Sequence, residues 1–444
     1  GTTYFLAVDG FEGEEGSFTL TVECSENPEC EDRDPNASCV DGQCVCNEGY
    51  EGDGHTCTLV CEDGNCDYDL VVLVEEGLEE ELAEQLERYK TDLVGDGKRA
   101  YVAVFEGGTA ADLRTVLGTQ IEEFSIEGAW LIGDLPAAWY EQTAFDSHEE
   151  FPCDLYLQDL DATWQDQDAD GKFDGHSDLD FDIYVSRLKG SIAQLKAYFD
   201  KNHTYRASGS LPSTRAFIFK DDDWASNWTG DKFGLDSIYS SVTLVEEISS
   251  TTRATYLDHL IEQGYQFVYQ WIHAAPTSLY IDEHDGYKQV TDSDIADGNH
   301  KGSFFNLFDC SAARFTETNL AMTYLVRTGY GLATHGSTKV GGNYSPGTFH
   351  TPLANGKTWG EAWKNWYMNE GKTDDEWWMG MCILGDPLIT LKGDRAAGLV
   401  EIPPVPWTAE QIAALRAIMV DWARHTDLGT FEDYRREHPQ FFKE

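Results

Sequence analysis

The chain has 444 residues, of which 80 are Asp or Glu and 31 are Lys or Arg, so its formal net charge at pH 7 is −49. This charge argues against nucleic acids and anionic membranes as partners, because both are polyanions, and no apolar run reaches the roughly 18 residues of a membrane span. The acidic residues are spread over the whole chain, which favours an acidic solvent-facing surface over a pocket for basic ligands.

The first 23 residues contain two alternating runs, Thr3–Phe11 and Gly16–Val22, around an acidic, glycine-rich turn. This pattern predicts a β-hairpin. No signal peptide precedes it, so we expect the sequence to begin inside a domain. The hairpin resembles the last hairpin of the small β-sandwich "pre-peptidase C-terminal" domains of bacterial secreted proteases.

The cysteines are concentrated near the N-terminus. Eight of the eleven lie between Cys24 and Cys66, a density typical of the disulfide framework of a secreted or cell-surface module. The spacing lacks paired Cys-x-x-Cys, which argues against zinc. Of the other three, a Cys153–Cys382 disulfide would leave Cys310 as the odd thiol.

Residues 24–66 resemble an EGF-like module, because a Cys44-Val45-Cys46 step is followed by Gly49-Tyr50-Glu51-Gly52-Asp53-Gly54. The resemblance implies the pairings Cys24–Cys39, Cys30–Cys44 and Cys46–Cys57, with Cys61 and Cys66 closing a small loop or a tie to the next domain. It also implies a spacer or a module for extracellular protein contacts.

From Asp67 onward, strand-like and helix-like patterns alternate, which predicts an α/β domain with a doubly wound, mostly parallel sheet over residues 67–392. Residues 393–407 form a Pro-rich linker and residues 408–444 a helical tail, which we expect to dock on the core. The predicted strands are 70–74, 100–105, 129–134, 182–188, 215–220, 267–272, 304–308, 329–334 and 388–391, and the predicted helices are 78–93, 110–124, 191–205, 251–263, 318–327, 359–370, 409–425 and 431–436.

Two of these strands end in reactive side chains. The run 267–272 leads into His273, and the run 304–308 leads into Asp309 and Cys310. If the strands are parallel neighbours, His273 and Cys310 share the carboxyl edge at which open α/β sheets bind ligands. Because an imidazole is the usual base that activates a thiol, the pattern predicts a Cys/His hydrolase.

The order of landmarks over 67–392 resembles the gingipain-type cysteine peptidases (peptidase family C25), relatives of caspases and legumains. The landmarks are Leu131-Ile132-Gly133-Asp134, Cys153-Asp154-Leu155-Tyr156-Leu157, Asp182–Leu188, the helix ending at Tyr205, the His273 and Cys310 strands, Gly336-Ser337-Thr338 and Leu384-Gly385-Asp386-Pro387. The resemblance implies a caspase-like fold, Cys310 as nucleophile and His273 as base. The backbone N–H groups of Ala274 and Cys310 would form the oxyanion hole.

The chain departs from the family at two positions. Family members carry Gly on both sides of the histidine, where this chain has Ile272 and Ala274, and a small residue before the cysteine, where it has Asp309. Asp309 would raise the pKa of the thiol or reach into the substrate pocket. These departures leave an inactive relative as an alternative.

A second histidine competes for the role of base. His335-Gly336 also follows a buried run, so a papain-like pairing of Cys310 with His335 is the rival interpretation.

Asp154 stands where arginine-directed family members carry the Asp of the primary specificity pocket. The resemblance therefore implies cleavage after Arg, or less readily after Lys, since a carboxylate binds a guanidinium as a fork. Asp154 would alternatively orient His273.

The loop Asp166–Asp174 predicts a calcium site. Carboxylates stand at positions 1, 3, 5 and 9 with Gly at position 6, as in an EF-hand loop, in which position 7 contributes its backbone carbonyl. Ser177 replaces the usual Glu at position 12, and Asp178 follows it. The expected ligands of this structural site are Asp166, Asp168, Asp170, Lys172, Asp174 and Asp178.

Together these features predict a secreted, calcium-stabilised cysteine endopeptidase without an organic cofactor. The alternatives are a transpeptidase of the same family that anchors surface proteins, and a catalytically silent extracellular binding protein that depends on calcium.

Overall fold

The computed structural model describes residues 37–40, 43–46, 50–59, 66–209, 211, 214–225, 229–283, 286–392 and 407–426. The chain divides into two compact units, Gly1–Cys66 and Asp67–Glu444. The hairpin expected over 1–23, the cysteines Cys24, Cys30 and Cys61, most of the linker and the helix expected over 431–436 lie outside the described residues.

The described part of the first unit consists of two short antiparallel hairpins. β1 (Ala37–Val40) pairs with β2 (Gln43–Cys46), and β3 (Tyr50–Gly52) pairs with β4 (Cys57–Leu59). The Cys46–Cys57 disulfide expected from the EGF resemblance is present, and Cys66 is also disulfide-bonded. Strands this short bury too little surface to fold alone, so the Cys46–Cys57 disulfide stabilises the described hairpins.

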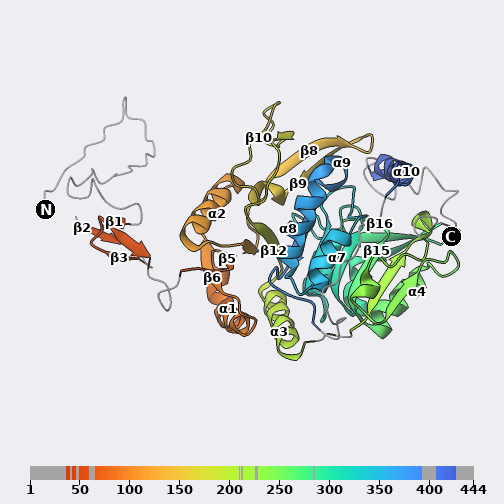
Figure 1. Cartoon of the computed structure of the whole chain (residues 1–444), viewed down its shortest axis with the longest axis horizontal. Coiled ribbons are helices and arrows are strands. Elements are labelled where there is room, and N and C mark those ends of the chain that lie inside the picture. The colour runs from red at the N-terminus through yellow and green to blue at the C-terminus, as the bar shows by residue number, and fades with distance from the viewer. Residues whose placement is uncertain are drawn as a thin grey trace, which may run out of the picture. The chain divides into compact units, whose positions relative to one another are not determined.

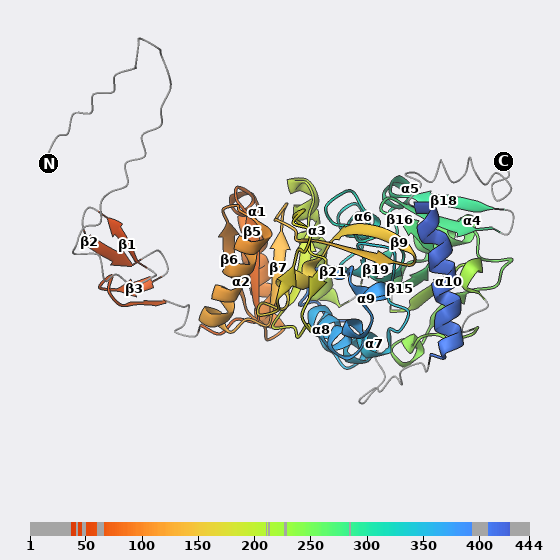
Figure 2. The same cartoon turned by 90° about the horizontal axis from the view of Figure 1, so that it is seen from above.

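The second unit is built on one ten-stranded sheet in the order β14-β13-β15-β19-β20-β21-β12-β7-β5-β6. The α/β class predicted from the alternating pattern is confirmed, and helices cover both faces, with α1, α3 and α6 on one side and α7 and α8 on the other (Figures 1 and 2). The strands are β5 (Leu70–Glu75), β6 (Ala100–Phe105), β7 (Gly128–Ile132), β12 (Tyr184–Leu188), β13 (Ala216–Lys220), β14 (Val242–Val245), β15 (Tyr265–Trp271), β19 (Gly302–Phe308), β20 (Ala333–Ser337) and β21 (Met381–Gly385).

The sheet consists of two parallel halves that run in opposite directions. Every neighbouring pair is parallel except β20 and β21, which are antiparallel. The carboxyl ends of β13, β15, β19 and β20 therefore lie at one edge, and those of β5, β7 and β12 lie at the other.

Several of the described helices begin with a capping box. Thr109, Ser191, Thr291 and Thr358 each form a capping box, which satisfies backbone N–H groups that have no partner inside the helix. The helices are α1 (Leu78–Gly95), α2 (Ala110–Phe124), α3 (Ile192–Ser208), α4 (Arg253–Asp258, continued by a π-turn at His259–Gln263), α5 (Asp292–Gly298), α6 (Leu320–Val326), α7 (Gly347–Ala354), α8 (Trp359–Asn369), α9 (Asp375–Trp378) and α10 (Ala409–Thr426). None of the described helices is long and apolar enough to cross a bilayer.

The strand predicted at 388–391 is wrong. The segment is buried at Leu388 and Ile389, but Pro387 cannot donate a ladder hydrogen bond. Instead the carbonyls of Pro387 and Ile389 accept the N–H groups of Gly360 and Trp359 at the start of α8.

Three smaller sheets that the sequence pattern did not predict accompany the main sheet in the described part of this unit. They are the hairpin of β8 (Trp139–Ala144) and β9 (Ser147–Pro152), the short pair β10 (Trp164–Gln165) and β11 (Gly175–His176), and the sheet of β16 (His273–Ala275), β17 (Ser278–Asp282) and β18 (Tyr287–Thr291). His273 is therefore the first residue of a new strand.

Candidate active site

The strands that carry His273 and Cys310 are parallel neighbours, as the prediction required. In the β15–β19 ladder, Trp271 is the partner of Phe308, and His273 and Cys310 each follow two residues later. Since neighbouring strands lie about 4.8 Å apart, the register brings the imidazole and the thiol to the same edge.

His273 is held by a carboxylate. Its Nε2 atom lies 3.3 Å from Oδ2 of Asp223, and its Nδ1 atom is buried without a hydrogen-bond partner among the described residues. The side chain is only 3% exposed. Nε2 thus faces an acceptor, which leaves Nδ1 as the nitrogen able to take a proton.

Asp223 is a site residue that the sequence interpretation missed. Burial alone would raise the pKa of this carboxyl, but hydrogen bonding and charge attraction from His273, together with the Tyr287 hydroxyl at 2.7 Å, hold the pKa below its usual value. In the sequence, Asp221–Asp223 directly follow the predicted strand 215–220, but only the observed pairing of Lys220 with Trp271 of β15 brings them to His273.

Cys310 is a buried thiol at the turn after β19. Its side chain is 3% exposed, and burial raises its pKa to about 12, with the carboxylates of Glu149 and Asp309 adding to the effect and the backbone N–H of Gly341 and the Lys339 ammonium opposing it. At neutral pH the resting group is therefore a thiol that needs a base.

Asp309 does not reach a substrate pocket. It is fully buried, and its two oxygens accept hydrogen bonds from Nε2 of Gln270 (2.5 Å) and the backbone N–H of Ile272 (3.2 Å). Burial raises its pKa well above the usual value. The pocket interpretation is thus wrong, and Asp309 instead ties the end of β19 to the end of β15, while the expectation that it raises the thiol pKa is met.

Asp154 has a partner inside the protein. Its two oxygens accept hydrogen bonds from Nε (2.7 Å) and Nη2 (2.8 Å) of Arg187, and the same guanidinium also donates to the carbonyls of Leu135 and Pro136. The two side chains are 1% and 6% exposed. The bidentate contact that Asp154 was predicted to make with a substrate arginine is made with Arg187 instead. The predicted roles of Asp154 in substrate specificity and in orienting His273 are therefore both wrong.

His335 lies inside the core. It belongs to β20, its ring packs against Phe349, Trp363 and Trp366, and neither ring nitrogen has a hydrogen-bond partner within the described part of the chain. Burial lowers its pKa well below the usual value. A neutral imidazole in an aromatic cluster is not placed to activate Cys310.

The other two isolated cysteines are free thiols, so the suggested Cys153–Cys382 disulfide is wrong. Cys153 donates to the Met379 carbonyl and Cys382 to the Ala313 carbonyl, and both are buried. Free cysteines in packed interiors behave as small apolar residues.

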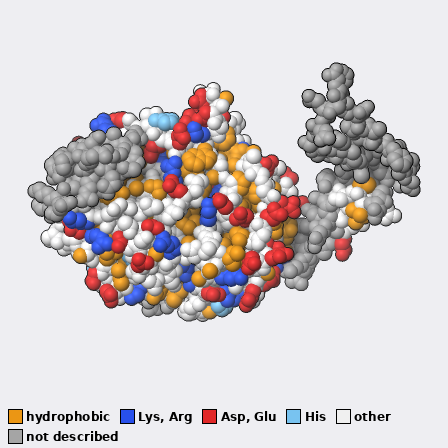
Figure 3. All heavy atoms as spheres, turned by 180° about the vertical axis from the view of Figure 1, so that it is seen from behind, with side chains coloured by type: hydrophobic (Ala, Val, Ile, Leu, Met, Phe, Trp, Pro, Cys, Tyr) orange, Lys and Arg blue, Asp and Glu red, His pale blue; other side chains and the backbone are white. Residues whose placement is uncertain are grey.

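The acidic loop lies between β10 (Trp164–Gln165) and β11 (Gly175–His176) and forms an acidic protrusion in Figure 3. Asp166 and Asp168 accept backbone N–H groups of the loop itself, and Asp178 is exposed beyond it. The structure adds a carboxylate from outside the loop, since ligand atoms of Glu141, Asp168 and Asp170 lie within 4.8 Å of one another.

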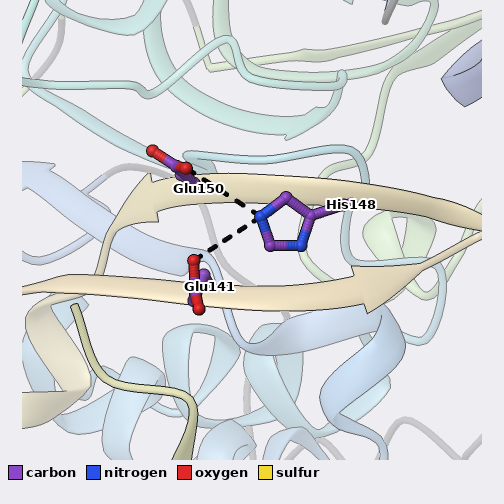
Figure 4. A group of neighbouring side chains, drawn as sticks. All are labelled: Glu141, His148 and Glu150. Carbon is purple, nitrogen blue, oxygen red and sulfur yellow. Dashed lines mark ion pairs between the residues drawn. The ribbon is translucent and has the colours of Figure 1, made fainter. Parts of the chain in front are cut away.

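Glu141 belongs to the β8–β9 hairpin, where Figure 4 shows it beside His148 and Glu150. His148 Nε2 lies 3.5 Å from Glu141 and 3.9 Å from Glu150. Lys172 pairs with both Asp170 and Glu150. The donor set is thus rich in carboxylates, as calcium requires, with a lysine ammonium as internal counter-charge.

The structure thus places a thiol and an imidazole at one carboxyl edge of an α/β sheet, with a carboxylate beside the imidazole. The model of peptidase family C25 matches residues 83–392, so the chain belongs to this family and is a cysteine peptidase. The chain also matches the nidogen of Drosophila melanogaster, with 35% identity over 96 residues, 19% of this chain and 7% of the nidogen. The chain thus spans a small fraction of that relative.

Proposed function

We propose that the protein is a secreted cysteine endopeptidase that uses Cys310 and His273. The observation that supports this most directly is the shared strand register, which gives the thiol and the imidazole the same offset beyond Phe308 and Trp271. The Asp223–His273 contact supports it further, because a carboxylate on one ring nitrogen fixes the tautomer that leaves the other nitrogen basic.

The mechanism follows from these positions. Nδ1 of His273 takes the proton of Cys310, and the thiolate attacks the scissile carbonyl. Backbone N–H groups of Cys310 and Ala274 stabilise the oxyanion, while Asp223 accepts a hydrogen bond from the Nε2–H group of the charged imidazole. The imidazolium then protonates the leaving amine, and water hydrolyses the acyl-enzyme.

Cleavage after a basic residue, Arg before Lys, is part of the proposal. Its support is electrostatic, since a chain of net charge −49 attracts basic peptide segments and repels acidic ones. Secretion is supported by the disulfide-bonded cysteines Cys46, Cys57 and Cys66, because such bonds persist in oxidising compartments.

Hydrolysis of Arg-, Lys- and Glu-anilide peptides by the wild type, Cys310→Ser and His273→Ala tests the proposal. We expect Arg and Lys substrates to be cleaved by the wild type, with kcat/KM falling at least about 10³-fold in either variant. Turnover that survives Cys310→Ser would rule out this nucleophile. Adding an amine acceptor separates hydrolysis from transpeptidation, since only a transpeptidase yields the amide product, and a silent protein gives no product at all.

We also propose calcium binding by the loop residues Asp166, Asp168, Asp170 and Asp174, with Glu141 in place of the missing position-12 Glu. The proposal rests on the proximity of Glu141, Asp168 and Asp170 and on the fit of carboxylate oxygens to calcium. Bound calcium would stiffen the loop against the β8–β9 hairpin. Calcium at about 100 times its Kd should stabilise the fold by about 2.7 kcal/mol, with Glu141→Gln weakening the effect. Equal Tm values in calcium and in EDTA would contradict the site.

A further inference from the structure

The C-terminal helix α10 packs on the edge of the sheet that carries the active site. Its buried residues Leu415, Met419, Trp422 and Ala423 recur at the spacing of one helix face, so the expectation that the tail docks on the core is met. Figures 1 and 2 both show α10, in blue, beside β16 and near the tip of the β8–β9 hairpin.

One side chain of this helix covers the imidazole. The Trp422 ring stacks on His273 with centroids 4.3 Å apart and an interplanar angle of 14°, and its other neighbours are Tyr280 and Tyr287. The indole therefore covers one face of the His273 ring. Together with Trp224, whose ring centroid lies 5.0 Å from that of His273, it leaves the imidazole only 3% exposed.

The start of the segment is anchored beside the same strand end. Trp407 stacks on Trp271 (6.4 Å, 2°) and packs against Tyr344 at 4.4 Å. The segment is thus fixed by aromatic contacts both before the helix and near its end.

Between these two contacts, Arg416 of α10 binds two carboxylates, which we call the Asp146–Glu376 clamp. Arg416 donates from Nε (2.9 Å) and Nη2 (2.8 Å) to Glu376 and from Nη2 to Asp146 (3.2 Å). Asp146 lies at the tip of the β8–β9 hairpin and Glu376 in α9. Glu376 also reaches the catalytic edge, because its carbonyl accepts a hydrogen bond from Lys339, whose charge acts on Cys310.

The spacing of the two contacts can be compared with that of an extended peptide. Trp422 follows Arg416 by six positions, which is about 9 Å along a helix at 1.5 Å per residue. An extended peptide covers the same distance with about three residues. A substrate lying along this edge would therefore place one side chain at the clamp and its scissile bond near His273.

We propose that α10 is an autoinhibitory segment that occupies the substrate-binding edge and competes with the substrate. In this arrangement the Asp146–Glu376 clamp is a subsite for a basic side chain of the substrate. This inference rests on the proposed function of Cys310 and His273. The full chain is then a partly masked enzyme, whose activity rises when α10 is displaced or removed. The Arg416 pairs are partly exposed, and exposed pairs contribute little to stability, so the buried apolar face of α10 supplies most of the docking energy.

Alkylation of Cys310 tests the masking without relying on turnover. Full-length wild type is compared with the double variant Arg416→Ala/Trp422→Ala and with Glu410→Ala, which removes an exposed charge from the same helix. Labelling by iodoacetamide is followed at Cys310 by peptide mapping. We expect labelling at least tenfold faster in the double variant and unchanged in Glu410→Ala. The single variant Trp422→Ala, which keeps the clamp, serves if the double variant does not fold.

Hydrolysis of an Arg-anilide peptide by the same proteins separates the two proposals. Faster labelling with faster hydrolysis supports the masking. Faster labelling with no hydrolysis by any protein supports the masking and overturns the proposed function. Unchanged labelling in a folded variant overturns the masking, whatever the hydrolysis.

The subsite is tested in Arg416→Ala/Trp422→Ala, in which the edge is no longer covered. The peptides differ only at the position three residues from the scissile bond. Arg there should lower KM about 2- to 5-fold relative to Gln, the range expected for a partly exposed ion pair. Replacing both carboxylates, in Asp146→Asn/Glu376→Gln, should remove most of this preference. A preference that persists in that variant would overturn the subsite.

Discussion

The Nε2 atom of His273 lies 3.3 Å from Oδ2 of Asp223, and this carboxylate comes from a different strand end than either His273 or Cys310. The edge of the sheet thus gathers three chemically distinct groups from the ends of β13, β15 and β19. Asp223 acts through His273, so its removal should alter proton transfer more than substrate binding.

Replacing Asp223 with Asn should lower kcat by about 10²- to 10⁴-fold with little change in KM, because the amide no longer selects the tautomer with a basic Nδ1. Asp222→Asn is the matched control, since Asp222 bonds to Thr251 rather than to His273. Steady-state kinetics of both variants give the comparison. Equal losses in the two variants would mean that the charge of the acidic run matters and the His273 contact does not.

The Cys310 thiol should respond to pH as a group whose pKa is raised. Because burial raises the pKa to about 12, the thiolate fraction should grow about tenfold for each pH unit between pH 7 and 9. The rate of iodoacetamide labelling at Cys310 in the full chain should follow it. A labelling rate that no longer rises above pH 7 would instead indicate a Cys310 thiolate paired with a charged imidazole.

The Asp154–Arg187 pair should matter for stability and not for specificity. Arg187→Met leaves the Asp154 carboxylate buried and unpaired, a change that costs about 3–5 kcal/mol, measured as the free energy of unfolding in urea. Asp134→Asn, which breaks the exposed pair with Lys189, should cost about 0–1 kcal/mol.

The second part of this prediction concerns substrate choice. Asp154→Asn should leave the ratio of Arg- to Lys-anilide hydrolysis unchanged, since its carboxylate already binds Arg187. A collapse of that ratio would restore Asp154 to the substrate pocket.

His335→Leu should keep activity and increase stability in mild acid. The folded state holds the His335 pKa well below its unfolded value of 6.5, so the wild type loses stability as the pH falls below 6.5, by up to about 1.4 kcal/mol per pH unit. The leucine variant lacks this loss, and its advantage in Tm should grow from pH 7 to pH 5. Loss of activity in a folded His335→Leu protein would revive the rival pairing with Cys310.

The sequence pattern predicted most strands and the longer helices of the sheet domain, because buried parallel strands and capped amphipathic helices leave strong local signals. It also located His273 and Cys310, since both follow strand ends. It failed at 388–391, where apolar residues are buried outside the sheet and bond to α8.

The remaining site residues depend on strand order, which is not a local property. Asp223 becomes a partner of His273 only because β13 lies next to β15, and a run of three Asp residues is otherwise an ordinary polar turn. Asp154 was misassigned because its partner, Arg187, lies on another strand. Trp422 could not be linked to His273 before the docking of α10 was known.

Because α10 follows the sheet in the sequence, it is also synthesised after the sheet. The last described strand of the sheet ends at Gly385, and α10 begins at Ala409, so a ribosome delivers the strand ends that carry His273 and Cys310 before it delivers the helix that packs on them. At about 5–20 residues per second, this interval lasts seconds. Each new molecule therefore passes through a brief uncovered stage, and because the helix is tethered to the same chain, it closes the edge at a speed that does not depend on the protein concentration.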